Sequence, residues 1–357
     1  MIGSSSPSAR TAPPVGPAPA AVEVKPVASR HDLKEFIEFP YRLYADDPAW
    51  VPPLLTEQRH EFSPRNPFFQ HARVQLFVAY RGAQPVGRIS AQIDALRLER
   101  YDDATGHFGV LEAIDDPAVF AALLHAAEEW LRAQGMRRVI GPFNLSINGD
   151  IGILIDGFEF PPVVLTGHGR RYYDARVQEQ GYHKTKLHAE VAAISTVFND
   201  AWADNWGFVP FTEAEFGALA NALKWIVPPE LVQLAYVGDE LAAMLIILPN
   251  LNELITGLRG RLLPFGWLRL LWRLRRHPPR SARVAQMGVR RKFQNTTLTM
   301  ALTFGLIEAV REPILRRQMR YLEMGWVLED NFRMLRIMRL LGGHRYKTYR
   351  VYEKLLV

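Results

Sequence analysis

A run of basic residues between an expected strand and an expected helix is the first place in this sequence that could do chemistry. The apolar segment 283–289 predicts a buried strand, Arg290, Arg291 and Lys292 follow it, and a helical pattern begins near Thr296. The first N–H groups of a helix lack intrahelical acceptors, and the helix dipole is positive there. The pattern therefore predicts a site for a phosphate-bearing ligand, although the three cations alone could equally be a solvated run of charge.

Glu329 and Asn331 end the next expected strand. A carboxylate there could accept a proton from a nucleophile, or it could only favour the positive first turn of the following helix. Asn331 could contact a ligand or cap that helix.

A second polar cluster follows a strand in the first half, from Asn144 through Asn148 to Asp150. It could line a substrate cleft, or form a turn that the Asn side chains hold together, and the turn is slightly favoured. The chain has no cysteine, which excludes a thiolate nucleophile and thiolate metal ligands. No His pair has the helical spacing with a Glu that a zinc hydrolase needs, so we expect no metal.

The elements that must position these residues alternate along the last quarter of the chain. In order, the pattern predicts a strand, the basic loop, a helix, a strand, a helix ended by Gly342-Gly343, and a last strand. Residues 22–143 show a similar order, with a helix that Asp116 caps and Pro117 begins. The expected elements of the last quarter are 283–289, 296–310, 321–328, 332–341 and 346–354.

The phrase Trp-Val-Leu-Glu-Asp-Asn at 326–331 and the ending Leu-Gly-Gly-His-Arg-Tyr-Lys-Thr-Tyr-Arg-Val-Tyr-Glu-Lys at 341–354 carry a resemblance. With this order of elements, the chain resembles the GNAT superfamily of N-acetyltransferases, in its bacterial branch with two such folds in tandem. Within that branch it is most similar to bacterial ceramide synthases, which acylate a sphingoid amine from acyl-CoA.

The resemblance implies an α+β or α/β chain of two GNAT-like folds, each a mixed, mostly antiparallel twisted sheet flanked by helices. We expect a disordered tail at 1–21, a first unit at 22–188 and a second unit at 189–357, with an insertion at 254–280. The turn before Pro117 carries Asp115 and Asp116, whose charges would repel a pyrophosphate. The second unit is therefore expected to hold acyl-CoA, as a co-substrate and not as a resident cofactor.

In the second unit the resemblance implies specific roles. Met287, Gly288 and Val289 would run along the pantetheine arm, and Asn331 would bond to it. Glu329 would be the general base, and Tyr349 would replace the usual tyrosine acid, whose position holds Met338. The pyrophosphate would contact Arg290, Arg291, Lys292, Thr296 and Thr297. The glycines that this loop usually carries are replaced here by Gln294-Asn295-Thr296-Thr297.

The insertion has an amphipathic pattern. Trp267, Leu271 and Trp272 lie on its apolar side, whereas Arg269 and Arg273 recur on the other. No acid occurs between Glu253 and Glu308, where 11 of the 43 basic residues lie; the remaining 32 face 37 acids elsewhere. The charge is thus local, which argues against a nucleic-acid partner and favours an anionic membrane surface. A helix packed on the protein core with a solvated Arg face is the alternative.

With no secretory signal and no apolar run of 18 residues, the sequence predicts a cytoplasmic protein, peripheral on the inner face of the cytoplasmic membrane. The leading hypothesis is an acyl-CoA-dependent N-acyltransferase that acts on a lipidic amine, best a sphingoid base. Acetylation of a soluble small amine is one alternative, and a catalytically silent fold that binds acyl-CoA is another.

Overall fold

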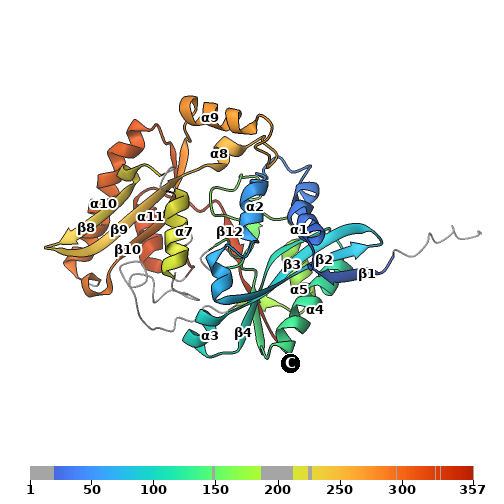
Figure 1. Cartoon of the computed structure of the whole chain (residues 1–357). Coiled ribbons are helices and arrows are strands. Elements are labelled where there is room, and N and C mark those ends of the chain that lie inside the picture. Colours follow the sequence, from blue (N-terminus) through green and yellow to red (C-terminus); the bar gives the residue numbers. More distant parts are fainter. Residues whose placement is uncertain are drawn as a thin grey trace, which may run out of the picture.

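Two β-sheets lie side by side in the computed structural model, each with helices on its faces (Figure 1). The structure describes residues 20–146, 149–185, 212–223, 227–294, 296–325, 327–329 and 331–356. The mixed sheets flanked by helices confirm the predicted fold class. Most of the expected tail, the expected start of the second unit near residues 189–197, and Asn148 lie outside the described residues.

The first sheet has seven strands in the order β1-β2-β3-β4-β5-β13-β7. Its pairs are antiparallel except for β4 and β5, which run parallel. The strands are β1 (Val22–Pro26), β2 (Ala72–Arg81), β3 (Gln84–Asp94), β4 (Thr105–Ala113), β5 (Arg138–Gly141), β7 (His183–Lys184) and β13 (Tyr352–Leu355). The helices of this half are α1 (Arg30–Leu43), α2 (Leu55–Glu61), α3 (Ala95–Tyr101), α4 (Pro117–Ala133) and α5 (Tyr173–Glu179), with a short 3-10 turn η1 (Pro67–Gln70).

α4 forms and packs for reasons visible in its sequence. Asp116 Oδ1 accepts a hydrogen bond from the N–H of Ala118 at 2.9 Å, and Pro117 supplies the first helical residue. Apolar side chains spaced three and four apart are fully buried against the sheet, with Phe120 and Leu131 among the largest. The capping role predicted for Asp116 is thus confirmed.

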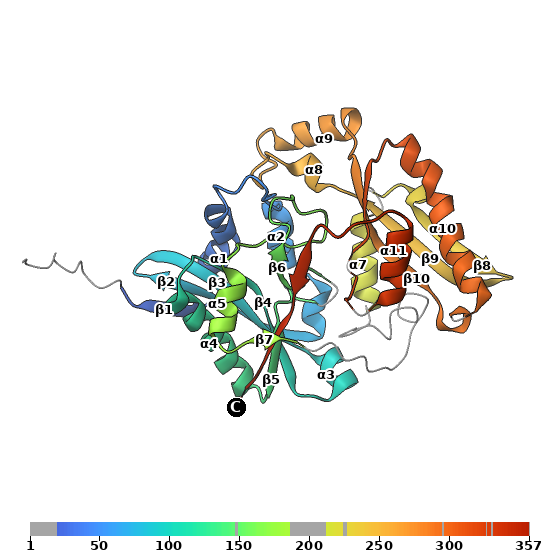
Figure 2. The same cartoon turned by 180° about the vertical axis from the view of Figure 1, so that it is seen from behind.

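The last strand of the chain belongs to the first sheet. β13 pairs antiparallel with β5, where Tyr352 lies opposite Gly141, and also with β7 (Figure 2). The expectation that residues 346–354 close the second unit is therefore wrong. Burial explains the difference: Tyr352 is fully buried in the first core and its hydroxyl donates to Asp174. Just before it, β12 (Thr348–Arg350) pairs with β6 (Ile153–Asp156) in a sheet of two strands.

The second sheet has the order β11-β10-β9-β8. The hairpin that joins β8 and β9 turns at Gly238, whose φ of +60° suits glycine. The helix α10 covers one face and extends six residues beyond the predicted end at Val310. The elements here are α7 (Glu213–Leu223), β8 (Val232–Val237), β9 (Glu240–Pro249), α8 (Asn252–Ile255), α9 (Gly266–Arg276), β10 (Ser281–Val289), α10 (Thr297–Arg316), β11 (Tyr321–Glu323) and α11 (Phe332–Leu340).

α9 lies at the outer edge of the molecule, beyond α8 (Figure 1). Leu270 packs onto a small cluster of buried side chains, and Arg273 donates to the carbonyl oxygens of Leu254 and Thr256, both at 2.6 Å. The prediction that Arg273 lies on an outward cationic face is therefore wrong, because its guanidinium closes the end of α8. Desolvation lowers the pKa of Arg273, and the nearby Arg269 adds to this effect.

Candidate active site at the junction of the two halves

A split between β10 and β11 is the main opening in the second sheet. The two strands pair in parallel only from Ser281–Tyr321 to Arg283–Glu323, although β10 continues to Val289. A β-bulge between Val284 and Gln286 marks the point where the strands separate. Within the described residues, Met287, Gly288 and Val289 thus pair with β9 on one edge and with no strand on the other.

The open edge offers hydrogen-bonding groups to an extended ligand. The side-chain oxygen of Gln286 is buried at the bulge and has no donor among the described residues. A buried acceptor without a donor is costly, so a ligand N–H in the split would satisfy it. These features fit a pantetheine arm, whose amides need donors and acceptors along a strand.

The basic loop at the end of β10 is already engaged by a carboxylate. Arg290 contacts Glu240 at 2.8 Å, and Lys292 forms an ion pair with the same side chain. The hydrogen bond from Lys292, followed by its charge and that of Arg290, lowers the pKa of Glu240. At the start of α10, Thr296 and Thr297 are exposed, and the hydroxyl of Thr296 donates to the carbonyl of Phe293 at 2.7 Å.

The corresponding place in the first half is closed by the chain itself. The N–H of Phe143 donates to Phe108 O at 2.9 Å, and Asn144 Oδ1 accepts from the N–H of Val110 at 2.9 Å. The segments lie so close that a Cβ on Gly109 would stand 1.7 Å from the carbonyl oxygen of Phe143. Asn144 therefore bridges β4 and the next segment, which supports the turn interpretation of its cluster.

Charged side chains from both halves meet where β10 leaves β11. Arg283, the last β10 residue paired with β11, is 3% exposed and donates to three carbonyl groups. Those carbonyls belong to Val164 and Leu165 in the first half and to Gly325 after β11. The charge of Arg283 acts on Asp150 of the first half, which retains some contact with solvent.

Two carboxyl groups at this junction have strongly raised pKa values. Desolvation raises the pKa of Asp150 to about 6, against the opposing effect of Arg283. Desolvation also raises the pKa of Glu61, at the end of α2, to about 7, and the charge of Asp150 adds to the shift. The sequence pattern gave no signal for Glu61 or Arg283, and Asp150 appeared only as part of a polar cluster.

The predicted acid, Tyr349, and the predicted base, Glu329, differ in burial and in their partners. Tyr349 is half-buried, and its hydroxyl donates to Gly167 O at 2.9 Å. Burial raises the pKa of Tyr349, which makes it a poor proton donor at neutral pH. Glu329 is 64% exposed and forms an ion pair of 2.6 Å with Lys184 on β7. Asn331 caps α11, since its Oδ1 accepts from the N–H of Met334 at 3.1 Å.

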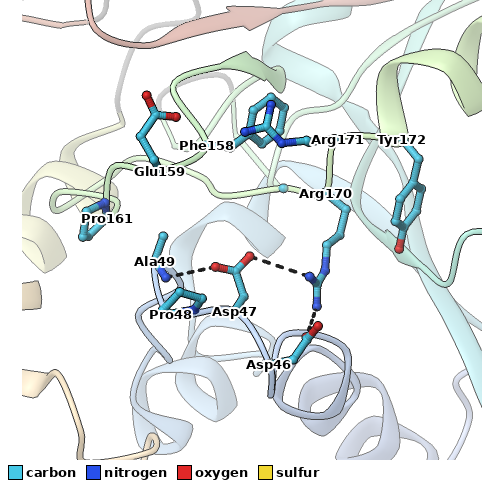
Figure 3. Close-up of a pocket in the computed structure, with 11 residues that line it drawn as sticks. Asp46, Asp47, Pro48, Ala49, Phe158, Glu159, Pro161, Arg170, Arg171 and Tyr172 are labelled. Atoms are coloured by element: carbon cyan, nitrogen blue, oxygen red, sulfur yellow. Dashed lines mark hydrogen bonds and ion pairs between the residues drawn. The ribbon is translucent and has the colours of Figure 1, made fainter.

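A hollow of about 590 Å³ opens elsewhere on the first half (Figure 3). Three of the charged side chains that line it are paired: Arg170 contacts Asp46 and also approaches Asp47 at 3.8 Å. Asp47 in turn accepts from the N–H of Ala49 at 3.0 Å. These contacts fix the loop after α1, and none of the predicted site residues lines this hollow.

Two named bacterial proteins are similar to this one over nearly its whole length. The sequence is 44% identical to bacterial ceramide synthase of Caulobacter vibrioides, over 94% of this chain and 98% of that protein. The chain belongs to the bacterial ceramide synthase family. It is also 42% identical to protein YghO of Escherichia coli, over 93% of this chain and 95% of that one. The family assignment confirms the predicted N-acyltransferase class.

The tandem fold is confirmed by a solved structure. The tandem GNAT protein from the clavulanic acid biosynthesis pathway matches with a TM-score of 0.52, over 94% of this chain and 99% of that chain, at 12% sequence identity. No model of a protein family matches the sequence. Within the described residues, no helix is long and apolar enough to cross a bilayer.

Proposed function

We propose that this enzyme transfers a long acyl chain from acyl-CoA to the amino group of a sphingoid base, and that it does so on the anionic inner face of the cytoplasmic membrane. The similarity to a protein named bacterial ceramide synthase supports the amine. The observation that carries the acyl-CoA site is the open edge of β10, beside the buried oxygen of Gln286.

The donor is proposed to lie in the second unit only. Its pantetheine arm would follow Met287 to Val289, and its phosphates would meet the N-terminus of α10, where helix N–H groups favour anions. Glu240 would release Arg290 and Lys292 to the phosphates, which carry more negative charge than one carboxylate. The closure of the first half at Phe143 and Asn144 supports this choice.

The open edge of β10 supports two of the requirements of amide formation from a thioester. N–H groups on the open edge of β10 can polarise the thioester carbonyl as negative charge develops on its oxygen. The split holds the thioester at one position, which converts an encounter into an oriented reaction. The amine still needs a group that removes its proton, because its pKa lies well above neutral.

The outer surface of α9 supports a lipidic amine and a membrane. Leu263 is 78% exposed and Phe265 is 72% exposed just before the helix, and Trp267, Leu271 and Trp272 are also exposed. A helix packed on the core, as the soluble-amine alternative requires, would bury these side chains. Six arginines of the same stretch are also exposed and have no ion-pair partner among the described residues: Arg259, Arg261, Arg269, Arg275, Arg276 and Arg280. An apolar surface rimmed by cations fits an anionic lipid interface.

A product screen tests the reaction. Mixed acyl-CoA donors would be incubated with sphinganine, polyamines and amino acids, and the products identified by mass spectrometry. We expect long-chain amides of sphinganine. Amides of polyamines or amino acids alone would favour the soluble-amine alternative, and no amide with any donor would favour the silent fold.

Vesicle flotation tests the membrane contact. On vesicles of phosphatidylcholine and phosphatidylglycerol, replacing Trp267, Leu271 and Trp272 by serine should weaken binding by about 100-fold, because each lost apolar side chain contributes about 1 kcal/mol or more. The matched control replaces three β8 side chains of similar exposure by serine, namely Val232, Leu234 and Tyr236. Equal loss in both variants would contradict a specific role for α9.

A further inference from the structure

We propose that Asp150 of the first half is the general base that accepts the amine proton, and that Glu61 passes this proton on to solvent. This inference rests on the proposed function and completes it, because Glu323, the second-unit carboxylate at the last β10–β11 pair, already accepts a hydrogen bond from the hydroxyl of Tyr346.

Asp150 is held by its backbone while its carboxylate stays available. Its carbonyl oxygen accepts from the N–H of Asn144 at 2.9 Å, and the neighbouring Ile151 bridges to Phe143. The carboxylate oxygens make no hydrogen bond to a described residue and retain contact with solvent. A substrate ammonium can therefore donate to them without first displacing a protein donor.

The surroundings of Asp150 place it at the mouth of the split. Its Cβ lies 4.0 Å from the position that a Cβ on Gly167 would take, and Gly167 is the residue whose carbonyl accepts from Tyr349. Across the junction stands Arg283, at the last pair before β10 and β11 separate. A first-half carboxylate thus faces the second-half strand that is proposed to hold the thioester.

Glu61 gives the proton a route outward. Its charge interacts with that of Asp150, and it lies at the end of α2, only partly exposed. Gln58 Nε2 donates to Glu61 Oε2 at 2.7 Å, and the buried Arg88 acts on it from β3. Two carboxylates that interact across a desolvated space share protons, because both cannot easily be charged together.

The substrate ammonium gives one proton to Asp150, and the neutral amine nitrogen attacks the thioester carbonyl carbon. The C–N bond forms and the C–S bond breaks, with the electron pair leaving on sulfur. The second nitrogen proton goes to the thiolate, which leaves as the thiol of CoA, and the first proton leaves through Glu61 to water.

The charged groups near Asp150 and its burial set the pH range in which its carboxyl group is ionised. Arg283 from β10 favours the carboxylate, whereas desolvation disfavours it. The charge of Asp150 in turn raises the pKa of Glu61, and Tyr349 from β12 stays neutral. The charge of Glu323, which lies opposite Arg283 on β11, also acts on Arg283. A pKa of about 6 leaves Asp150 ionised at neutral pH yet basic enough to accept a proton. The exposed Glu329, paired with Lys184, lacks such an enclosure.

The test is the pH profile of kcat/KM for whichever amine the wild-type enzyme acylates. Asp150→Asn should lower kcat by about 100-fold or more and remove the acid limb near pH 6, with melting temperature and acyl-CoA affinity retained. Asp156→Asn, an exposed aspartate on nearby β6, is the matched control and should keep both rate and limb.

A second variant tests the proposed route of the proton from Asp150 to Glu61. Glu61→Gln removes the group that takes the proton onward and should lower kcat with acyl-CoA affinity retained, while the acid limb stays near pH 6, because Glu61 has the higher pKa and is mostly protonated where Asp150 titrates. A near-wild-type rate in Asp150→Asn, with a 100-fold loss in Glu329→Gln, would overturn the proposal while leaving the N-acyltransferase intact. If Asp150→Asn did not fold, a wild-type profile without an acid limb near pH 6 would overturn it instead. Acylation of a different amine would correct the proposed substrate, and the same limb would still test Asp150.

Discussion

Asp116 shows how the role of a single carboxylate follows from what it contacts. It caps α4 and forms an ion pair of 2.5 Å with Arg81, so it stabilises the first half and leaves no place for a phosphate. Asp116→Ala should lower the free energy of unfolding by about 1 kcal/mol and leave acyl-CoA affinity unchanged.

Urea unfolding and an acyl-CoA titration would measure the two effects. Asp115→Ala serves as the control, because its side chain is half exposed and pairs only with the surface residue Arg176. A fall in acyl-CoA affinity with Asp116→Ala would place a donor site in the first half.

At the residue scale, capping was predictable and the buried charges were not. Asp116 and Asn331 stand directly before helical patterns, so their caps can be seen in the sequence. Arg283, Glu61 and Asp150 come from segments far apart in the chain, and only tertiary packing brings their charges together. Local pattern carries no information on such contacts.

At the scale of elements, the local sequence pattern predicts α9 but not the way it packs. The spacing of its residues predicts an amphipathic helix, but it does not say which side faces the protein. Leu270 and Arg273 attach the helix to α8, so Trp267 and Trp272 stay outside. The orientation of α9 follows from two contacts. Leu270 packs onto the small apolar cluster under the helix, and Arg273 donates hydrogen bonds to the last carbonyl groups of α8.

A histidine joins an element of the first half to one of the second. His71, after η1, contacts Asp94 of β3 at 3.0 Å and Glu215 of α7 at 3.3 Å. The hydrogen bond to Asp94 and then the ion pair with Glu215 raise the pKa of His71 to about 9. The charged form therefore stabilises the folded state fully below the unfolded pKa of about 6.5, and this contribution is lost as pH rises through 9.

Unfolding at pH 6 and at pH 10 would measure this effect. The wild-type protein should lose about 1–3 kcal/mol more between these two pH values than His71→Gln does. His183→Gln changes a histidine that is 62% exposed and should follow the wild-type curve. Identical pH dependence in wild type and His71→Gln would contradict the ion pairs across the two halves.

At the scale of the whole molecule, β13 makes the first half depend on the end of the chain. The strand fills the position between β5 and β7, and Tyr352 buries its entire side chain there. Lys354 adds an ion pair of 2.8 Å with Glu128, whose side chain is 5% exposed. The sequence pattern predicts this strand, but side chains that alternate between two faces do not indicate which sheet the strand joins.

The first half alone should therefore not fold. Residues 20–185 lack the strand between β5 and β7, so the sheet is interrupted and the site of Tyr352 is left open. We expect no cooperative urea transition for this fragment, and recovery of one when residues 346–356 are joined to it by a flexible linker. The same fusion with Tyr352→Ala should lose about 3–5 kcal/mol, whereas Leu355→Ala, on a side chain 64% exposed, should cost little. Cooperative unfolding of residues 20–185 alone would show that the first sheet does not need β13 to fold. The two halves could then separate without loss of either fold.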